Sequence, residues 1–329
     1  YALWLKQDTT ADITPFELIK IPANAVIDKA FSHGMSYALT QLQKMIDAYL
    51  NEPSLPYLAK VVELLALIRH GFWMFESHLP AAAEAIRDEL SHFLQLFQWV
   101  DGAVYLKELT NKTGNYRKRI DLSRQLSEQL KIEKRRYPDA EQVIELIVSA
   151  RFNRLQLDLL ALFLQIDGQD NETSNQANEA VIDNQSELLK SNQRTLLKFA
   201  SKCLKVSAIN VFSDNDHKPT MTSEEYLREQ KFVVRHLLTG SWFGSLFDKE
   251  KRLTYRSPWL DIKVGLSELQ TLWVLQKQLH LLDEMPQKLV NWHHSKVESL
   301  ILALDSSRDT ATNIPKYWLD IERFISPSI

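Results

Sequence analysis

Basic side chains are concentrated in one segment of the 329-residue chain, residues 112–136, where they could bind phosphate groups. The bases there are Lys112, Arg117, Lys118, Arg119, Arg124, Lys131, Lys134, Arg135 and Arg136, against the acids Asp121, Glu128 and Glu133. Arg151 and Arg154 follow on the next expected helix. Two interpretations stay open, a solvated charged helix or a strip that binds anions through salt-sensitive attraction.

A single charge also interrupts an apolar pattern upstream. One stripe repeats at alternating spacings of three and four, which predicts a buried helix face: Leu58, Val61, Leu65, Ile68, Phe72, Phe75 and Leu79. A second stripe runs beside it at the same period: Ala59, Val62, Ala66, Arg69 and Trp73. Arg69 is the charged member of the second stripe. We expect it either to bind an anion or to have a local partner.

Patterns for metal chemistry are incomplete in this sequence. A di-iron bundle needs two Glu-x-x-His pairs, and the chain offers one, Glu89 with His92. Asp214 and Glu225 have the spacing of a calcium loop, but Pro219 stands where that loop needs glycine. We therefore expect no metal site in this chain.

The other titratable residues also predict no catalytic site. His293 and His294 are adjacent, so on a helix they point in different directions and cannot share one metal. Cys203 lies in an amphipathic stretch and is expected to be a core residue. We expect no catalytic residue and no cofactor, and this chain by itself is not expected to be an enzyme.

The composition favours an all-α fold. Glycine occurs 8 times in 329 residues, well below the roughly 7% of ordinary proteins. The sequence contains no GxGxxG, GxxxxGK[ST] or GxSxG motif, which excludes the common glycine-dependent nucleotide folds and hydrolases. Helical periodicity and short loops predict two antiparallel four-helix bundles, packed side by side as pseudo-repeats.

Charge and hydropathy indicate the surroundings of the protein. The net charge is −3, which argues neither for nucleic-acid binding nor for membrane binding, and we expect neither a membrane nor a sequence-specific nucleic acid as a partner. No apolar run reaches the length of a membrane span. One cysteine excludes disulfides within the chain and suits a reducing compartment, so we expect a cytoplasmic protein.

Prolines and polar stretches divide the chain into expected units. Residues 1–24 read as an extended lead-in, 25–166 as the first bundle, 167–178 as a polar linker and 179–329 as the second bundle. The expected helices span 25–51, 57–79, 80–110, 116–136, 139–166, 179–206, 223–247, 259–283, 286–304 and 315–325. The chain begins with Tyr1, so a preceding segment is expected to be missing.

The chain resembles a CHAD domain, the conserved-histidine α-helical domain, of the kind fused behind a CYTH triphosphatase domain. Tyr1-Ala2-Leu3 resembles the tail that closes a CYTH domain, and the sequence LLALIRHGFWMFESHLP resembles the second-helix motif of CHAD domains. The two helical halves match the paired bundles of that family in layout. Such CYTH–CHAD proteins are bacterial.

The resemblance implies an anion site on the second helix. There the family has a histidine and several arginines that line a cavity for inorganic polyphosphate. With Phe75 as the final aromatic, the last arginine falls on Arg69, the histidine on Ala59, and the other arginines on Val62, Ala66 and Leu67. The equivalent helix of the second half is expected near 258–276. Of the family's Arg-Asp motif on the third helix, Asp101 remains.

The resemblance also implies a function. The chain would be a non-catalytic accessory domain of a CYTH-type inorganic triphosphatase, with weak polyphosphate binding on a degenerate basic surface. Hydrolysis and its divalent metal would belong to the absent CYTH domain, covalently linked to this one. The candidate polyphosphate or anion ligands are Arg69, Arg117, Lys118, Arg119, Arg124, Arg135, Arg136, Arg151 and Arg154. The alternative is a helical protein-interaction scaffold without a phosphate ligand.

Overall fold

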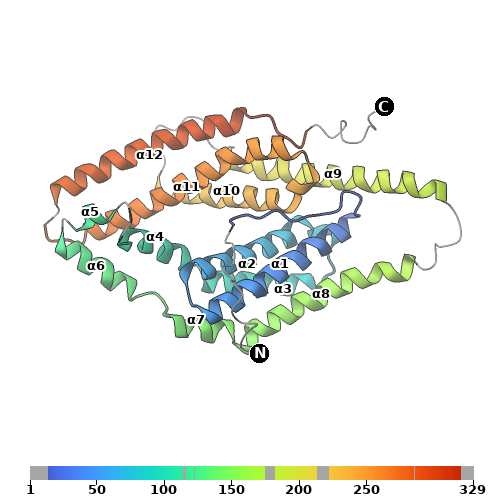
Figure 1. Cartoon of the computed structure of the whole chain (residues 1–329), viewed down its shortest axis with the longest axis horizontal. Coiled ribbons are helices and arrows are strands. Elements are labelled where there is room, and N and C mark those ends of the chain that lie inside the picture. The colour runs from blue at the N-terminus through green and yellow to red at the C-terminus, as the bar shows by residue number, and fades with distance from the viewer. Residues whose placement is uncertain are drawn as a thin grey trace, which may run out of the picture.

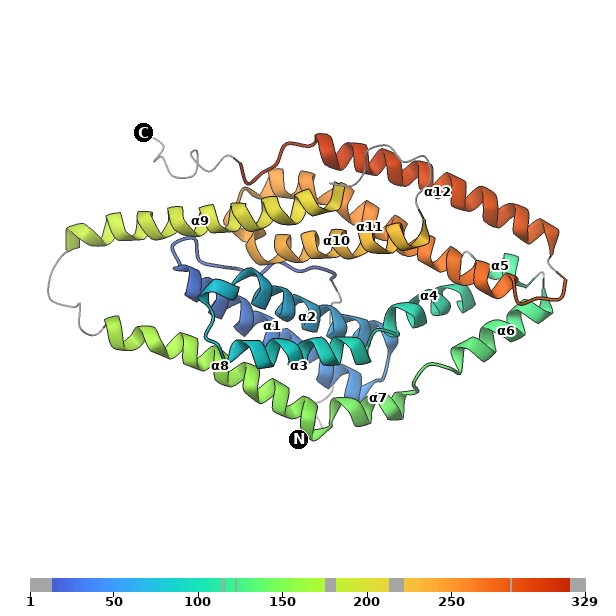
Figure 2. The same cartoon turned by 180° about the vertical axis from the view of Figure 1, so that it is seen from behind.

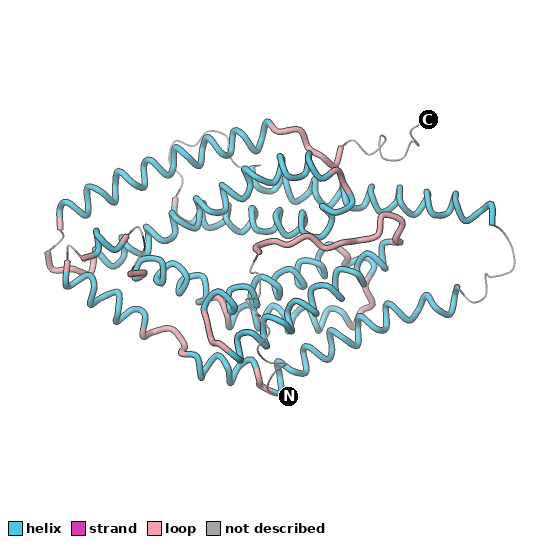
Figure 3. The backbone as a smooth tube through the Cα atoms, in the orientation of Figure 1, coloured by secondary structure: helices cyan, strands magenta, loops and turns pink. Residues whose placement is uncertain are grey.

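The computed structural model describes residues 14–112, 114, 116–121, 123–174, 182–212, 222–284 and 286–319. Helices form almost all of this part of the chain, and it contains no strand, so the expected all-α class is confirmed (Figure 3). The helices are α1 (Ile27–Asn51), α2 (Leu55–Met74), α3 (Ala83–Leu96), α4 (Val100–Thr110), α5 (Arg117–Ile120), α6 (Arg124–Lys134), α7 (Ala140–Ile147), α8 (Ala150–Ser174), α9 (Ile182–Phe212), α10 (Ser223–Phe243), α11 (Lys249–Leu279) and α12 (Gln287–Asn313).

The helices form two groups that lie side by side (Figure 1). Helices α1, α2, α3 and α8 pack together in the first half of the chain, and α9, α10, α11 and α12 follow one another in the second. The two groups meet where α2 contacts α10 and where α4 contacts α11. Seen from behind, α8 and α9 extend together beyond the other helices at one end (Figure 2).

The first apolar stripe predicted a buried helix correctly. Leu58, Val61, Leu65, Ile68, Phe72 and Phe75 are all buried on α2 or at its end. The helix begins behind Ser54 with Pro56 in its first turn, where proline costs no hydrogen bond, and a 3₁₀ turn at Glu76–His78 follows it. Ala66, Arg69 and Trp73 of the second stripe lie near residues of α10.

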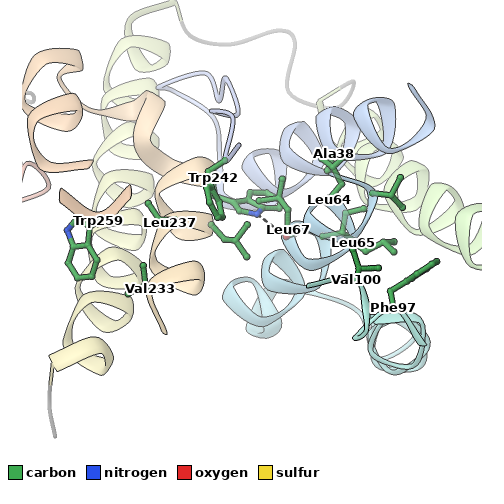
Figure 4. Close-up of a cluster of buried hydrophobic side chains, with 14 of the residues drawn as sticks. Ala38, Leu64, Leu65, Leu67, Phe97, Val100, Val233, Leu237, Trp242 and Trp259 are labelled. Atoms are coloured by element: carbon green, nitrogen blue, oxygen red, sulfur yellow. Dashed lines mark hydrogen bonds between the residues drawn. The ribbon is translucent and has the colours of Figure 1, made fainter. Parts of the chain in front are cut away.

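Trp242 joins the two halves. Its fully buried ring comes from α10 and packs over Gly71 of α2 and Gly34 of α1, where a Cβ would lie only 2.4 and 1.8 Å from the ring. The indole N–H donates to the carbonyl of Leu67 at 3.2 Å (Figure 4). Glycine is needed at both positions because any side chain would occupy the volume of the ring. The buried apolar residues of both halves consequently belong to one core cluster.

The lead-in also ties the two halves together. The Ile19 N–H donates to the Ser241 carbonyl at 2.9 Å, and the Lys60 ammonium donates to the Thr14 carbonyl at 2.7 Å. Arg256 of α11 donates to the Phe16 carbonyl at 2.6 Å. Residues 14–26 thus lie across α2, α10 and α11 without forming a helix. Tyr1-Ala2-Leu3 lies outside the described residues.

Several helix boundaries differ from the sequence expectation. The expected 80–110, 116–136 and 139–166 helices are each split in two, and α8 continues to Ser174, so residues 167–174 of the expected linker are helical. Helix α11 begins at Lys249 and contains Pro258. The sequence predicts a helix that begins near residue 259, directly after this proline, because proline usually interrupts a helix. Burial of Tyr255 and Trp259 on either side of that proline holds the helix in place. In place of the expected 315–325 helix, residues 315–319 form a turn, and the remainder lies outside the described residues.

No helix in the described ranges is long and apolar enough to cross a membrane.

Candidate anion site between the two halves

A cavity of about 840 Å³ opens between α2 and α10. Helices α3, α4 and α9 complete its wall. The charged residues that line it are Arg69, Arg87, Asp101, Lys231 and Arg235. Four of the five are basic, so the cavity is positively charged.

Three of these cations have no acidic partner. Within the described part of the chain, Arg69, Lys231 and Arg235 make no ion pair, and Arg69 makes no hydrogen bond through its side chain. Arg87 differs, because it pairs with Glu76 at 2.9 Å and with Glu84 at 3.4 Å. An enclosed guanidinium without a carboxylate retains all its donors for a ligand.

The electrostatics of the cavity favour an anion. Burial and the neighbouring Arg235 lower the pKa of the half-buried Arg69 guanidinium, which stays positively charged at neutral pH. Burial, Arg235 and Arg69 lower the pKa of His70 to about 3, so that imidazole is neutral. The like charges of Arg69 and Arg235 destabilise each other across the cavity. A bound anion would relieve that repulsion.

Asp101 is the carboxylate in the wall of this cavity. The Asp101 side chain reaches the solvent of the cavity but is otherwise surrounded by protein. This desolvation raises the pKa of its carboxyl group, and the positive charge of Lys263 lowers that pKa by a smaller amount. Gln230 lies nearby in the wall and is 8% exposed. Its side-chain amide donates to the Tyr105 hydroxyl at 3.0 Å, and its buried Oε1 has no hydrogen-bond partner.

Helix α10 is the counterpart of α2, and this relation explains the position of the bases. His70 of α2 meets Thr239 of α10 in a buried hydrogen bond of 2.8 Å, at a sequence separation of 169. The same offset aligns the ends of both helices, each followed by a 3₁₀ turn. It also pairs identical residues: Ser54 with Ser223, Tyr57 with Tyr226, Leu58 with Leu227, Gly71 with Gly240, and Trp73 with Trp242.

The offset places the bases of α10 opposite apolar residues of α2. Ala59, Val62 and Ala66 correspond to Arg228, Lys231 and Arg235, whereas Arg69 corresponds to Leu238. Each half thus supplies the basic residues that the other lacks. The expectation that the equivalent helix lies near 258–276 is wrong, because that segment belongs to α11. The sequence does contain a sign that the two helices are equivalent, because the pattern Ser-x-x-Tyr-Leu…Gly-x-Trp occurs in both. This repeat is recognised only when α2 and α10 are compared in the structure.

Of the predicted anion ligands, Arg69 alone lines this cavity, as far as the described residues go. The expected 116–136 helix is divided, with α5 ending at Ile120 and α6 beginning at Arg124, so its bases lie on these two helices or just beyond them. Most of these bases are exposed, and three of them are paired: Arg117 with Asp121 at 2.8 Å, Arg124 with Glu128 at 3.0 Å, and Arg136 with Glu133 at 2.8 Å.

The remaining predicted residues are also outside the cavity. Arg119 lies over the Trp292 ring at 5.6 Å, and Lys118 and Arg135 are exposed. Arg151 makes two hydrogen bonds to the Glu89 carboxylate, at 2.5 and 2.8 Å, and Arg154 lies 3.7 Å from Asp158. Glu89 is therefore occupied by an arginine, and no group of three or more potential metal ligands occurs among the residues that the structure describes.

Comparison with known proteins supports the fold. No family model matches the sequence, and no curated protein matches it. Among solved structures, the chain is similar to the crystal structure of the CHAD domain from the plant Ricinus communis, with a TM-score of 0.55 and 16% sequence identity. The likeness covers 95% of this chain and 96% of that chain. The chain therefore has the all-α fold of a CHAD domain over nearly its whole length.

Proposed function

We propose that this protein is a CHAD-type module that binds inorganic polyphosphate in the cavity between α2 and α10. The observation that carries the proposal is the set of three cations without acidic partners, Arg69, Lys231 and Arg235, on facing walls of one cavity. Phosphate oxygens form charge-assisted hydrogen bonds with such groups, and a polymer of phosphates can contact both helices at once.

The same proposal assigns no catalytic role to the chain. Acid–base catalysis needs a group that titrates near neutral pH beside the ligand, and His70 is held neutral with a pKa of about 3. In the proposal, this module is accessory to a CYTH-type triphosphatase domain in a cytoplasmic protein. It would hold phosphate polymers near the domain that hydrolyses them with a divalent metal.

Titration calorimetry with long-chain polyphosphate tests the binding. At about 50 mM salt we expect measurable affinity, which falls steeply towards about 200 mM because phosphate contacts release counterions. Arg69→Ala should weaken binding about tenfold or more, because it removes an enclosed guanidinium. Arg117→Ala is the matched control, since Arg117 is paired with Asp121 and lies outside the cavity.

The outcomes separate the two candidate surfaces. A larger loss for Arg117→Ala than for Arg69→Ala would place the ligand on α5 and α6 and contradict the cavity. No affinity at the lower salt concentration would contradict phosphate binding altogether. The coding sequence upstream of Tyr1 tests the link to a triphosphatase: an E-x-E-x-K strand motif would support it, and a start codon near Tyr1 would contradict it.

A further inference from the structure

One aromatic side chain in the cavity wall, Trp73, is half exposed to solvent. Trp73 is 47% exposed and lines the cavity, with its ring stacked on His70 at 5.3 Å between centroids and 22° between planes. Its counterpart Trp242 is fully buried and fills the space over Gly71. At the equivalent glycine, Gly240, no atom lies within 4 Å of where a Cβ would be. Trp73 therefore does not make the packing contact that explains Trp242.

The same wall carries a hydrogen-bond acceptor that bare polyphosphate cannot use. Asp101 lines the cavity and makes no ion pair in the described ranges. Polyphosphate at neutral pH offers acceptor oxygens and negative charge, so it would repel Asp101. A ligand that pairs with Asp101 must carry N–H or O–H donors as well as phosphates.

We infer that the cavity takes a nucleoside polyphosphate, an inference that rests on the proposed binding of phosphates there. Arg69, Lys231 and Arg235 hold the phosphate chain. The nucleobase stacks on the Trp73 ring, and ribose hydroxyls or a base amino group donate to Asp101. The cavity volume of about 840 Å³ lies within the range of pockets for ligands of this size. The combination of cations, a solvent-facing indole and free acceptors is what this class of ligand needs.

Calorimetry on the full chain with ATP and with inorganic tripolyphosphate tests the inference, in a metal-free buffer with a chelator. The two ligands carry similar charge, so electrostatic attraction alone gives similar affinities. We expect ATP to bind about tenfold more tightly, because base stacking on an aromatic ring adds to the phosphate contacts. Trp73→Leu should remove that advantage and leave the affinity for tripolyphosphate unchanged.

Two further variants sharpen the test. Asp101→Asn should weaken ATP binding and strengthen tripolyphosphate binding, because it replaces one of the two acceptor oxygens by an N–H donor and also removes a repelling charge. Trp292→Leu is the control, since Trp292 lies beside Arg119 and outside the cavity. It should change neither affinity.

Each result decides between the two proposals. Equal affinity for ATP and tripolyphosphate, both weakened by Arg69→Ala, would overturn the nucleotide inference and leave the phosphate site intact. An ATP preference that survives Trp73→Leu would overturn the role of Trp73. A loss of ATP affinity in Trp292→Leu would place the nucleotide beside Arg119 and Trp292 instead of in the cavity. Failure of both ligands to bind would overturn both proposals.

Discussion

Helices α2 and α10 occupy equivalent positions in the two halves, yet several of their equivalent residues differ in burial, contacts and charge. At the 169-residue offset, one tryptophan of the pair is buried and the other exposed, and one glycine is covered by a ring while the other faces open space. The bases are divided in the same way, with Arg69 on α2 and Lys231 and Arg235 on α10.

This difference shows how two equivalent helices can carry different residues and still line one cavity together. The two helices face each other, so a charge lost from one wall of the cavity can be retained on the other. The basic segment 112–136 shows the contrary case. It has more charges than the cavity, but most of its arginines are exposed beside carboxylates, where an ion pair contributes little. Arg69, Lys231 and Arg235 instead share one cavity and pair with no carboxylate in the described part of the chain, so the number of bases is a weaker indicator of a site than their grouping around a cavity.

The largest expected difference between the two helices concerns the paired tryptophans. Trp242→Ala should lower the free energy of unfolding by about 3–5 kcal/mol, because it empties a buried volume between α1, α2 and α10. Trp73→Ala should cost less than about 1 kcal/mol, because the ring is half exposed. Urea unfolding followed by circular dichroism measures both. Similar costs would contradict the asymmetry.

A pH series tests the buried histidines, one on each helix. Burial holds the pKa of His70 and of His236 at about 3 in the folded protein, against about 6.5 in the unfolded chain. The unfolded chain therefore binds more protons below pH 6.5, so stability is lost as the pH falls from about 6.5 towards 3. Between pH 7 and 5 the loss should be about 2 kcal/mol for each histidine.

Two variants show which histidines cause this loss of stability at low pH. His70→Gln should reduce the pH dependence of the urea midpoint by about half of the histidine contribution. His294→Gln is the control, because that imidazole is 77% exposed. An unchanged slope in His70→Gln would show that the ring is not held neutral.

The equivalent glycines should respond with opposite signs. Gly71→Ala puts a methyl group 2.4 Å from the Trp242 ring and should lower stability by about 1–3 kcal/mol through overpacking. Gly240→Ala meets no atom within 4 Å and should raise stability by about 0.5–1 kcal/mol, as alanine is the better helix former. Thermal unfolding of the two variants gives the comparison, and a shift of the same sign in both would refute it.

The sequence predicts the parts of this architecture that depend on local pattern. The stripe from Leu58 to Phe75 identifies α2 because helical periodicity is a short-range property. The split of the expected 80–110 helix was missed because Phe97 is buried and Trp99 stacks on Tyr137, and neither contact is visible in the spacing of the segment.

The candidate site is only partly predictable for the same reason. Arg69 stands out as a charge on an apolar stripe, but whether it has a partner depends on which helix faces it. Lys231 and Arg235 lie on an amphipathic helix whose bases look like an ordinary solvated face until α10 is placed against α2. Pairing between residues 169 positions apart is set by tertiary packing, so it could not be read from either helix alone.

Moving one charge between the two helices tests the central claim most directly. Ala66 and Arg235 are equivalent positions that line the same cavity. Arg235→Ala should weaken polyphosphate binding about tenfold, and adding Ala66→Arg should restore the affinity to within about threefold of the original protein. A double variant that folds normally but binds no better than Arg235→Ala would contradict a single site shared by α2 and α10.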